Sequence, residues 1–220
     1  MKNLFKIICL KKVKYAFFLI FLLFIYIIIS AYSYTLSVSS NLSDSVFRLH
    51  VIANSDSQDD QELKLKVRDS LINYLNSISK ECKSKDDVII LVKNHINDFY
   101  DIANTTIKDN GFTYNVNIDV GNFEFPTKTY GDISFPAGYY DALRVKIGDA
   151  KGCNWWCVMF PPLCFVNVTS GIVPDDSKAE LENELSEEDY KIISSDSFEY
   201  KIKFKLVELF QGRNIITAKK

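Results

Sequence analysis

The chain has 220 residues, of which 26 are basic and 28 acidic, and its formal net charge is −2. Five lysines and no acid lie in the first 35 residues, so residues 36–220 carry 21 basic and 28 acidic side chains, a charge of −7. An acidic body of this kind excludes a nucleic-acid-binding module, which needs a basic face to neutralise phosphates.

The N-terminus predicts a signal peptide or a membrane anchor. Residues 15–35 contain no charged side chain, and five lysines precede them. A helix of this length, about 31 Å, spans the hydrocarbon core of a bilayer. The positive-inside rule leaves the lysines in the cytoplasm and sends the remaining chain across the membrane. Ala31-Tyr32-Ser33 fits a signal-peptidase site, so cleavage of residues 1–35 and their retention as an anchor both stay open.

The exported part is expected to contain one folded domain. Residues 36–46 are rich in Ser, Thr and Asn and are expected to be a tether. Residues 47–212 are expected to form the extracytoplasmic domain, and residues 213–220 a tail. Residues 175–189 hold eight acids and one lysine, which predicts a solvated, partly helical excursion, with an acidic docking arm as the alternative.

Hydrophobic periodicity predicts the fold class. Apolar residues recur at helical spacing in residues 59–79 and 85–103. The Phe125-Pro126 and Phe135-Pro136 pairs are expected to be two turns of one loop. We therefore expect an α/β (α+β) fold, a single domain with two N-terminal helices packed on a mixed β-sheet. Strands or buried extended segments are expected at residues 47–53, 112–120, 139–147, 155–160, 163–168 and 198–206.

Four of the five cysteines follow the apolar segment and would face an oxidising compartment. Cys157 and Cys164 flank a double proline, and a bend there would bring them within bridging distance. A Cys153–Cys157 pair and buried free thiols are the alternatives. The cysteine spacing lacks a C-x2-C pair, and the two histidines are distant in sequence. We therefore expect no zinc site and no cofactor.

Polar and aromatic residues indicate where a partner would bind. The first strand ends in a polar corner of Arg48, His50, Asn54 and Asp56, beside the start of a helix. Such a corner suits binding a carboxylate or a partner's backbone, and a purely structural corner is the alternative. Trp155-Trp156 point to opposite sides of an extended chain, so one of them is free to anchor a partner or touch a membrane surface.

A cysteine-dependent hydrolase is the alternative from another functional class. His50 would be the base, Asn54 or Asp56 its orienting group, and Cys157 or Cys164 the nucleophile. Burial among aromatic residues would raise the pKa of these thiols, which argues against this reading. The sequence contains no nucleophile elbow, phosphate loop, dinucleotide fingerprint or D-[TS]-G motif. We therefore expect no catalytic residue and no small-molecule substrate.

Three sequence blocks resemble one known family. They are residues 48–69 (RLHVIANSDSQDDQELKLKVRD), residues 121–148 (GNFEFPTKTYGDISFPAGYYDALRVKIG) and residues 152–165 (GCNWWCVMFPPLCF). Together they resemble the stage II sporulation protein R family of endospore-forming bacteria. The combination of VIANSDS, PTKTYG and NWWCVxFPPLCF is specific to that family.

The resemblance implies a signalling protein. A family member is exported from the forespore into the space between the two membranes. There it activates a membrane-embedded aspartic protease, stage II sporulation protein GA, which processes pro-sigma-E in the mother cell. The resemblance implies a ligand and not an enzyme; a membrane-tethered structural protein of the spore envelope is a weaker alternative. The expected contact surface consists of Arg48, His50, Asn54, Asp56, Lys128, Tyr130, Trp155 and Trp156.

Overall fold

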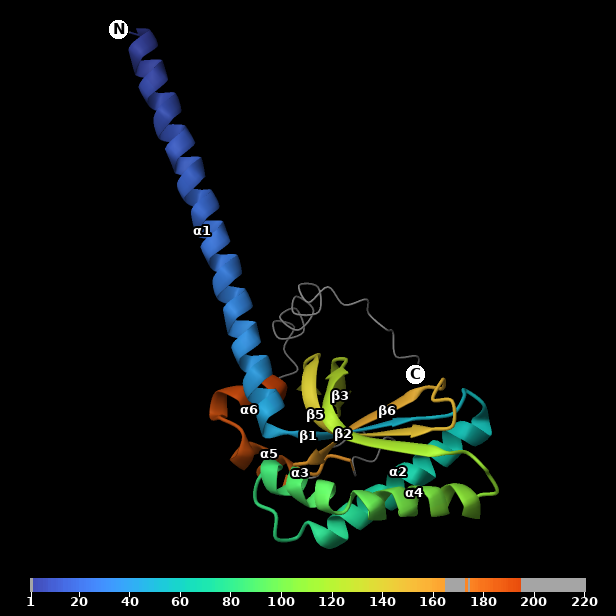
Figure 1. The fold of residues 1–220 in the computed structure, drawn as a ribbon. Helices are drawn as coiled ribbons and strands as arrows, with labels where there is room; N and C mark the ends of the chain where they lie inside the picture. The colour runs from blue at the N-terminus through green and yellow to red at the C-terminus, as the bar shows by residue number, and fades with distance from the viewer. Residues whose placement is uncertain (1, 165–172, 174, 195–220) are drawn as a thin grey trace. The chain divides into compact units, whose positions relative to one another are not determined.

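The computed structural model describes residues 2–164, 173 and 175–194, which Figure 1 draws in colour. The chain divides into two compact units, Met1–Val38 and Ser39–Lys220. The strand expected at residues 198–206 and most of the extended segment expected at residues 163–168 lie outside the described residues.

The first unit is helical. Helix α1 runs over Lys2–Ser45. Within it, Lys12–Ser30 is long and apolar enough to cross a membrane, with a mean hydropathy of 2.4 and no burial against the rest of the protein. Side chains such as Phe17 and Tyr26 are more than two thirds exposed, as expected for a helix that meets lipid and not a protein core. The segment is compatible with a signal peptide or a membrane anchor.

The last residues of α1 belong to the second unit and are not an irregular tether. Residues 36–45 are helical although Ser, Thr and Asn are poor helix formers. Leu42, near the end of α1, and Val46, directly after the helix, are fully buried. Burial of these two side chains accounts for the helical end, because tertiary packing overrides weak intrinsic propensity.

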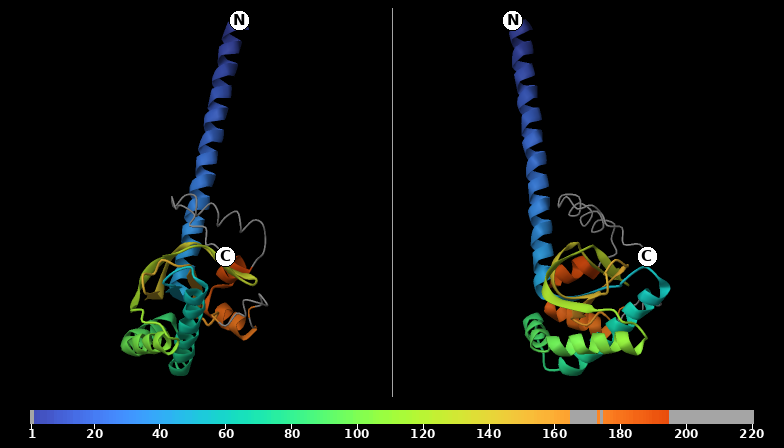
Figure 2. Two further views of the ribbon diagram at one scale, coloured as in Figure 1. Left: turned by 90° about the vertical axis from the view of Figure 1, so that its right-hand side faces the viewer. Right: turned by 45° about the vertical axis from the view of Figure 1, so that its right-hand side comes forward.

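A four-stranded mixed sheet forms the centre of the second unit. Strand β1 (Phe47–Ile52) pairs in parallel with β5 (Gly138–Ile147) and antiparallel with β6 (Asn154–Phe160). Strand β2 (Val116–Phe125) pairs antiparallel with β5, so the strand order is β2-β5-β1-β6. The expected mixed sheet is confirmed. The long β2–β5 pair is strongly curved (Figure 2).

Two details of the strand prediction were wrong. Strand β2 begins four residues later than expected and continues past Gly121, because its whole length pairs with β5. The expected Phe-Pro loop contains a hairpin, β3 (Lys128–Tyr130) with β4 (Ile133–Phe135), which forms a separate two-stranded sheet. Gly131, with a φ of 59°, supplies the left-handed turn residue between them.

Three helices cover one face of the main sheet (Figure 1). Helix α2 (Gln58–Ile78) begins at Ser57, whose hydroxyl accepts a hydrogen bond from the amide of Asp60. Helix α3 (Lys85–Asn94) and helix α4 (Ile96–Asp109) replace the single helix expected at residues 85–103. The apolar period continues across the break at His95, so periodicity alone did not reveal it.

The hydrophobic core lies between these helices and the sheet. Its residues are supplied by alternate positions of the strands and by one stripe of each helix. Burying a large aliphatic or aromatic side chain stabilises a fold by about 1.5–3 kcal/mol, so this layer contributes most of the stability. The core includes Leu49, Val51, Leu63, Val67, Leu71, Phe99, Ala103, Ile107, Leu143, Val145 and Ile147.

The acidic segment is helical and only partly solvated. It forms α5 (Asp175–Glu184) and part of α6 (Glu187–Ser194). Its acids are mostly exposed, but Leu181 and Leu185 are buried. The segment is therefore packed onto the protein through its apolar side chains.

Gly152 is required by a close backbone approach. A Cβ atom at this position would clash with the carbonyl group of Ser55. We expect Gly152→Ala to lower the free energy of unfolding by about 1–3 kcal/mol, the usual effect of overpacking. The measurement is urea unfolding of the full chain in a non-ionic detergent.

Gly111→Ala is the control for this substitution. Gly111 has a φ of 83° and no atom within 4 Å of an added Cβ, so the substitution strains the backbone without a clash. We expect a loss of about 1–2 kcal/mol, from backbone strain alone. A loss at Gly152 no larger than the loss at Gly111 would contradict the close approach.

Candidate functional site

The second face of the sheet carries basic and aromatic side chains. Arg48 and His50 of β1 lie opposite Val158 and Trp156 of β6, and His50 lies beside Arg144 of β5. Side chains alternate along a strand, so paired positions share a face. We call this surface the basic aromatic face; it consists of Arg48, His50, Asp119, Phe123, Phe125, Tyr140, Arg144, Lys146 and Trp156.

Arg48 is the most deeply buried charge on this face, with an exposed fraction of 0%. Its guanidinium carbon lies 4.2 Å from the ring centre of Phe125 and 4.7 Å from that of Tyr140. Its Nη2 atom donates to the hydroxyl oxygen of Tyr130 at 2.9 Å. The Nε and Nη1 atoms have no hydrogen-bond partner, and no described carboxylate is paired with the guanidinium. Cation–π contacts replace a counter-ion here.

The β3–β4 hairpin covers Arg48. Besides accepting from Arg48, the Tyr130 hydroxyl donates to the carbonyl oxygen of Trp156 at 3.1 Å. Burial raises the pKa of Tyr130, and the positive charge of Arg48 only partly opposes this rise. Burial and the charge of Arg48 lower the pKa of Lys128, at the start of the hairpin. Lys128 is two residues from Tyr130 on β3, so its side chain leaves the hairpin on the same side as the ring that contacts Arg48.

His50 is stacked and neutral. Its ring lies 3.7 Å from that of Trp156 at an angle of 16°, and its Nε2 atom donates to Oδ1 of Asn154 at 2.7 Å. Burial, together with the charges of Arg144 and Arg48, lowers its pKa to about 4, although the hydrogen bond to Asn154 opposes the change. The imidazole is therefore uncharged near neutral pH, which suits packing and not proton transfer.

Asn54 and Asp56 lie elsewhere and have structural contacts. The Asn54 side chain donates to Asp60 at 2.9 Å and accepts from the amide of Asp149 at 2.9 Å. Asp56 accepts from the amide of Cys153 at 2.6 Å. Burial alone would raise the pKa of Asp60, but hydrogen bonds from Ser55 and Asn54 outweigh it and lower the pKa. These contacts join the start of α2 to the β5–β6 loop, as the structural alternative for this corner expects.

The two tryptophans point to opposite faces of the sheet. Trp155 packs against the hydrophobic core, and the guanidinium carbon of Arg68 lies 4.1 Å from its ring centre. Trp156 lies on the basic aromatic face, half-buried against His50 and Phe125. The structure thus brings together five of the eight residues expected at the contact surface and separates Asn54, Asp56 and Trp155 from them.

The cysteines do not form a catalytic pair with His50. Cys157 and Cys164 are joined by a disulfide with a Cα–Cα distance of 5.3 Å, one of the arrangements that the sequence left open. Cys157 lies opposite Leu49, so it faces the core while His50 faces the other way. Burial and neighbouring acids raise the pKa of the free Cys82 thiol, which disfavours a thiolate. Within the described part of the chain no group of three metal-ligating side chains occurs.

The sequence analysis did not assign six residues of the basic aromatic face to the contact surface: Asp119, Phe123, Phe125, Tyr140, Arg144 and Lys146. Phe123 and Phe125 were assigned to a region beyond the end of a strand, and Tyr140 and Arg144 gave no separate signal. Arg144 stacks on Phe123 at 3.9 Å and pairs with Asp119 at 3.3 Å. The outward position of Arg144 was visible in the alternation of residues 139–147, but its neighbours depend on the strand register.

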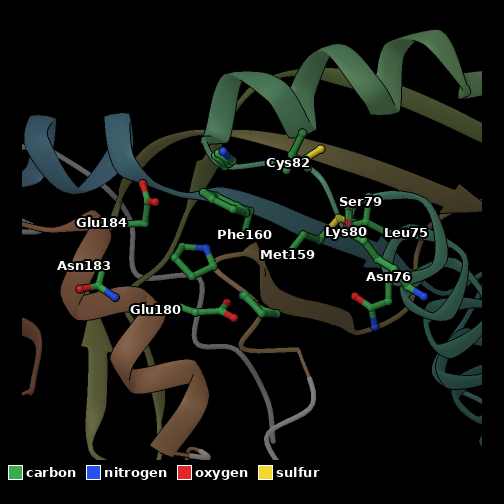
Figure 3. Close-up of a pocket in the computed structure, with 14 residues that line it drawn as sticks. Leu75, Asn76, Ser79, Lys80, Cys82, Met159, Phe160, Glu180, Asn183 and Glu184 are labelled. Carbon is green, nitrogen blue, oxygen red and sulfur yellow. The ribbon is translucent and has the colours of Figure 1, made fainter.

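A pocket of about 430 Å³ is a second candidate site (Figure 3). Side chains from the end of α2, from β6 and from α5 surround it. Lys80 and Lys83 contribute positive charge, and Glu180 and Glu184 contribute negative charge. None of the eight expected contact residues lines this pocket.

The buried state of His50 predicts a pH dependence of stability. The pKa of His50 is about 4 in the folded protein against an ordinary value of 6.5, so the unfolded chain binds the proton more readily. Stability is therefore full above pH 6.5 and falls as the pH decreases towards 4, by up to about 3 kcal/mol. Urea unfolding of the full chain between pH 4 and 7.5 measures this change.

His50→Phe is the matched variant, because it retains an aromatic ring against Trp156 and cannot bind a proton. Its overall stability is expected to be lower, since the hydrogen bond to Asn154 is lost. Its stability should nevertheless fall less steeply between pH 6.5 and 4. Parallel pH profiles of the variant and the native chain would contradict the assignment.

Comparison with known proteins identifies the family. The family Stage II sporulation protein R matches residues 43–170, which contain the main sheet and helices α2, α3 and α4. Stage II sporulation protein R of Bacillus subtilis (strain 168) is 35% identical over 130 residues, which are 59% of this chain and 58% of that protein. The chain thus matches less than two thirds of its relative's length, and no solved structure matches it. Because the family match covers more than half of the chain, the protein belongs to the stage II sporulation protein R family of sporulation proteins.

Proposed function

We propose that this protein is a signal exported from the forespore that activates a protease of the mother cell. The protease is the membrane-embedded aspartic protease stage II sporulation protein GA, and its substrate is pro-sigma-E. Family membership and an N-terminal helix compatible with export support this proposal. The protein would act in the space between the two membranes, either anchored by residues 15–35 or released after their cleavage.

The basic aromatic face is the observation that carries the proposal. It holds a half-buried tryptophan and several cations, and within the described residues it holds no cysteine and no histidine able to act as a base. Aromatic residues and arginine are the side chains that most often dominate protein–protein affinity. The surface therefore has the chemistry of recognition and lacks that of nucleophilic catalysis.

Activation requires that the signal bind one state of the protease more tightly than the other. A shift from about 1% to 99% active protease needs roughly 5.5 kcal/mol of differential affinity. An interface of ordinary size buries about 800 Å² on each partner, and a few aromatic anchors can supply most of its energy. A face with Trp156 at its edge and Lys128 close by is sufficient for such a role.

Reconstitution in a non-sporulating host tests the proposal. The host co-expresses this chain, the protease and a tagged pro-sigma-E. We expect cleavage of pro-sigma-E only when the chain and the protease are both present. Equal cleavage without the chain, or cleavage without the protease, would contradict the proposed activation.

Trp156→Ala is expected to reduce cleavage at least about tenfold in this assay, because it removes the aromatic anchor of the proposed interface. Tyr100→Ala is the matched control, since Tyr100 is an aromatic residue of α4 that is 42% exposed and belongs to the helical layer. The control should retain cleavage. Circular dichroism of both variants verifies that they fold, and equal loss in both would remove the basic aromatic face from the interface.

The two nucleophiles considered from the sequence are joined in the Cys157–Cys164 disulfide, and a double substitution tests a hydrolase that would use one of the other described cysteines. Cys82 and Cys153 are the described cysteines outside the Cys157–Cys164 disulfide whose side chains the structure places. Cys82→Ala with Cys153→Ala leaves the Cys157–Cys164 disulfide in place and removes both thiols. We expect cleavage of pro-sigma-E to stay within about twofold of the native level, since surface changes of this kind seldom alter a distant interface. Complete loss of activity in a folded double variant would favour the hydrolase.

A further inference from the structure

The guanidinium of Arg48 has hydrogen-bond donors that the protein does not use. The residue is fully buried, yet among the described residues Nε and Nη1 have no hydrogen-bond partner, and Nη2 alone donates, to Tyr130 at 2.9 Å. Buried donors are nearly always satisfied in folded proteins. A buried cation is normally paired with an acid, because removal from water strongly disfavours a lone charge. Among the described residues, the site therefore lacks a negatively charged hydrogen-bond acceptor.

The described surroundings of Arg48 add positive charge and no negative charge. Arg48 contributes to lowering the pKa of Lys128 and of His50, which places both groups within reach of its charge. The acid on the same face, Asp119, is paired with Arg144 at 3.3 Å and with Lys146 at 3.9 Å. No described acid is paired with Arg48. Two cations thus share a site that holds no described anion.

The aromatic contacts determine which atoms of Arg48 remain available. Phe125 and Tyr140 lie 4.2 Å and 4.7 Å from the guanidinium carbon. The two ring planes are 74° apart, so at most one ring lies flat on the guanidinium, and neither ring is a hydrogen-bond partner for Nε or Nη1. Two parallel N–H groups at the edge of a guanidinium match the two oxygens of a carboxylate, and the apolar walls strengthen the charge-assisted bonds.

We infer that Arg48 and Lys128 form a carboxylate-binding site that receives an aspartate or glutamate side chain of the partner protein. The identity of the partner rests on the proposed function, but the carboxylate site itself is a property of this chain. The inference assigns an acidic residue to the partner's contact surface, which would insert among the rings of Phe125 and Tyr140.

The hairpin supplies the route to Arg48. Strands β3 and β4 pair only with each other, over three residue pairs. Ile133 and Phe135 of β4 are fully buried and hold the hairpin in place, so the movement required is that of the Tyr130 side chain. The Tyr130 hydroxyl is a neutral acceptor for Arg48, and a carboxylate is a stronger one. The incoming side chain would therefore displace Tyr130 and release its contact with the Trp156 carbonyl.

Acetate is a probe for this site that requires no partner. The full chain is unfolded with urea in a non-ionic detergent at pH 7.5 with 100 mM sodium acetate, sodium chloride or acetamide with chloride. With a dissociation constant of roughly 10 mM, acetate raises the ratio of folded to unfolded protein about tenfold. Chloride and acetamide should have no such effect. Equal stability in acetate and chloride would overturn the inference.

Variants locate the effect. Arg48→Met preserves an unbranched apolar side chain against the rings and removes the charge, so the gain from acetate should disappear. Arg68→Met is the matched control, because Arg68 also stacks on an aromatic ring, that of Trp155 on the opposite face. The control should retain the tenfold gain. Lys128→Gln should reduce the gain without abolishing it; an undiminished gain in Arg48→Met would show that acetate acts elsewhere and would overturn the site.

The two proposals fail in different experiments. A gain from acetate in a chain that does not promote cleavage of pro-sigma-E would retain the carboxylate site and reject the proposed function. Cleavage that depends on the chain, with no acetate effect, would retain the function and reject the site. Inorganic phosphate at the same ionic strength is the last comparison: stabilisation by phosphate and not by acetate would reject a carboxylate as the ligand.

Discussion

Strand β1 is buried on both faces, and its position between β5 and β6 determines where each functional side chain lies. Its odd-numbered residues face the helices and join the core, while Arg48 and His50 face the other way. A shift of one residue in register would exchange these two sets and place a guanidinium in the aliphatic core. The burial of Leu49 and Val51 in the core therefore determines that the side chain of Arg48 points to the opposite face.

This constraint explains why a charge is buried on the face of the sheet opposite helices α2, α3 and α4. The rings of Phe125, Phe135 and Tyr140 enclose the guanidinium at distances of 4.2–5.7 Å and compensate part of its lost hydration. They cannot satisfy its N–H groups, because a ring face accepts charge without fixing a hydrogen-bond direction. A surface of this kind is stable enough to fold, and in the proposed site the binding of an anion stabilises it further.

The sequence predicted the parts of this arrangement that local patterns control. The alternation in residues 47–53 and 139–147 located β1 and β5, and the helical spacing of apolar residues in 59–79 located α2. The break at His95 escaped prediction because Ile96 and Phe99 continue the apolar stripe of α3. The continuation of β2 to Phe125 also escaped, since only pairing with β5 carries the strand past Gly121.

The candidate site shows the same division between local and non-local information. Arg48 and His50 could be assigned to one face from alternation alone. The position of Asn54 and Asp56 in a structural corner could not, because it depends on hydrogen bonds to Asp149 and Cys153, almost 100 residues away in the sequence. The separation of Trp155 from Trp156 was expected for an extended chain, whereas the side that each takes depends on the β1–β6 register. Recognition surfaces on sheets are generally of this kind, because the chain contributes side chains from strands whose order only the folded topology establishes.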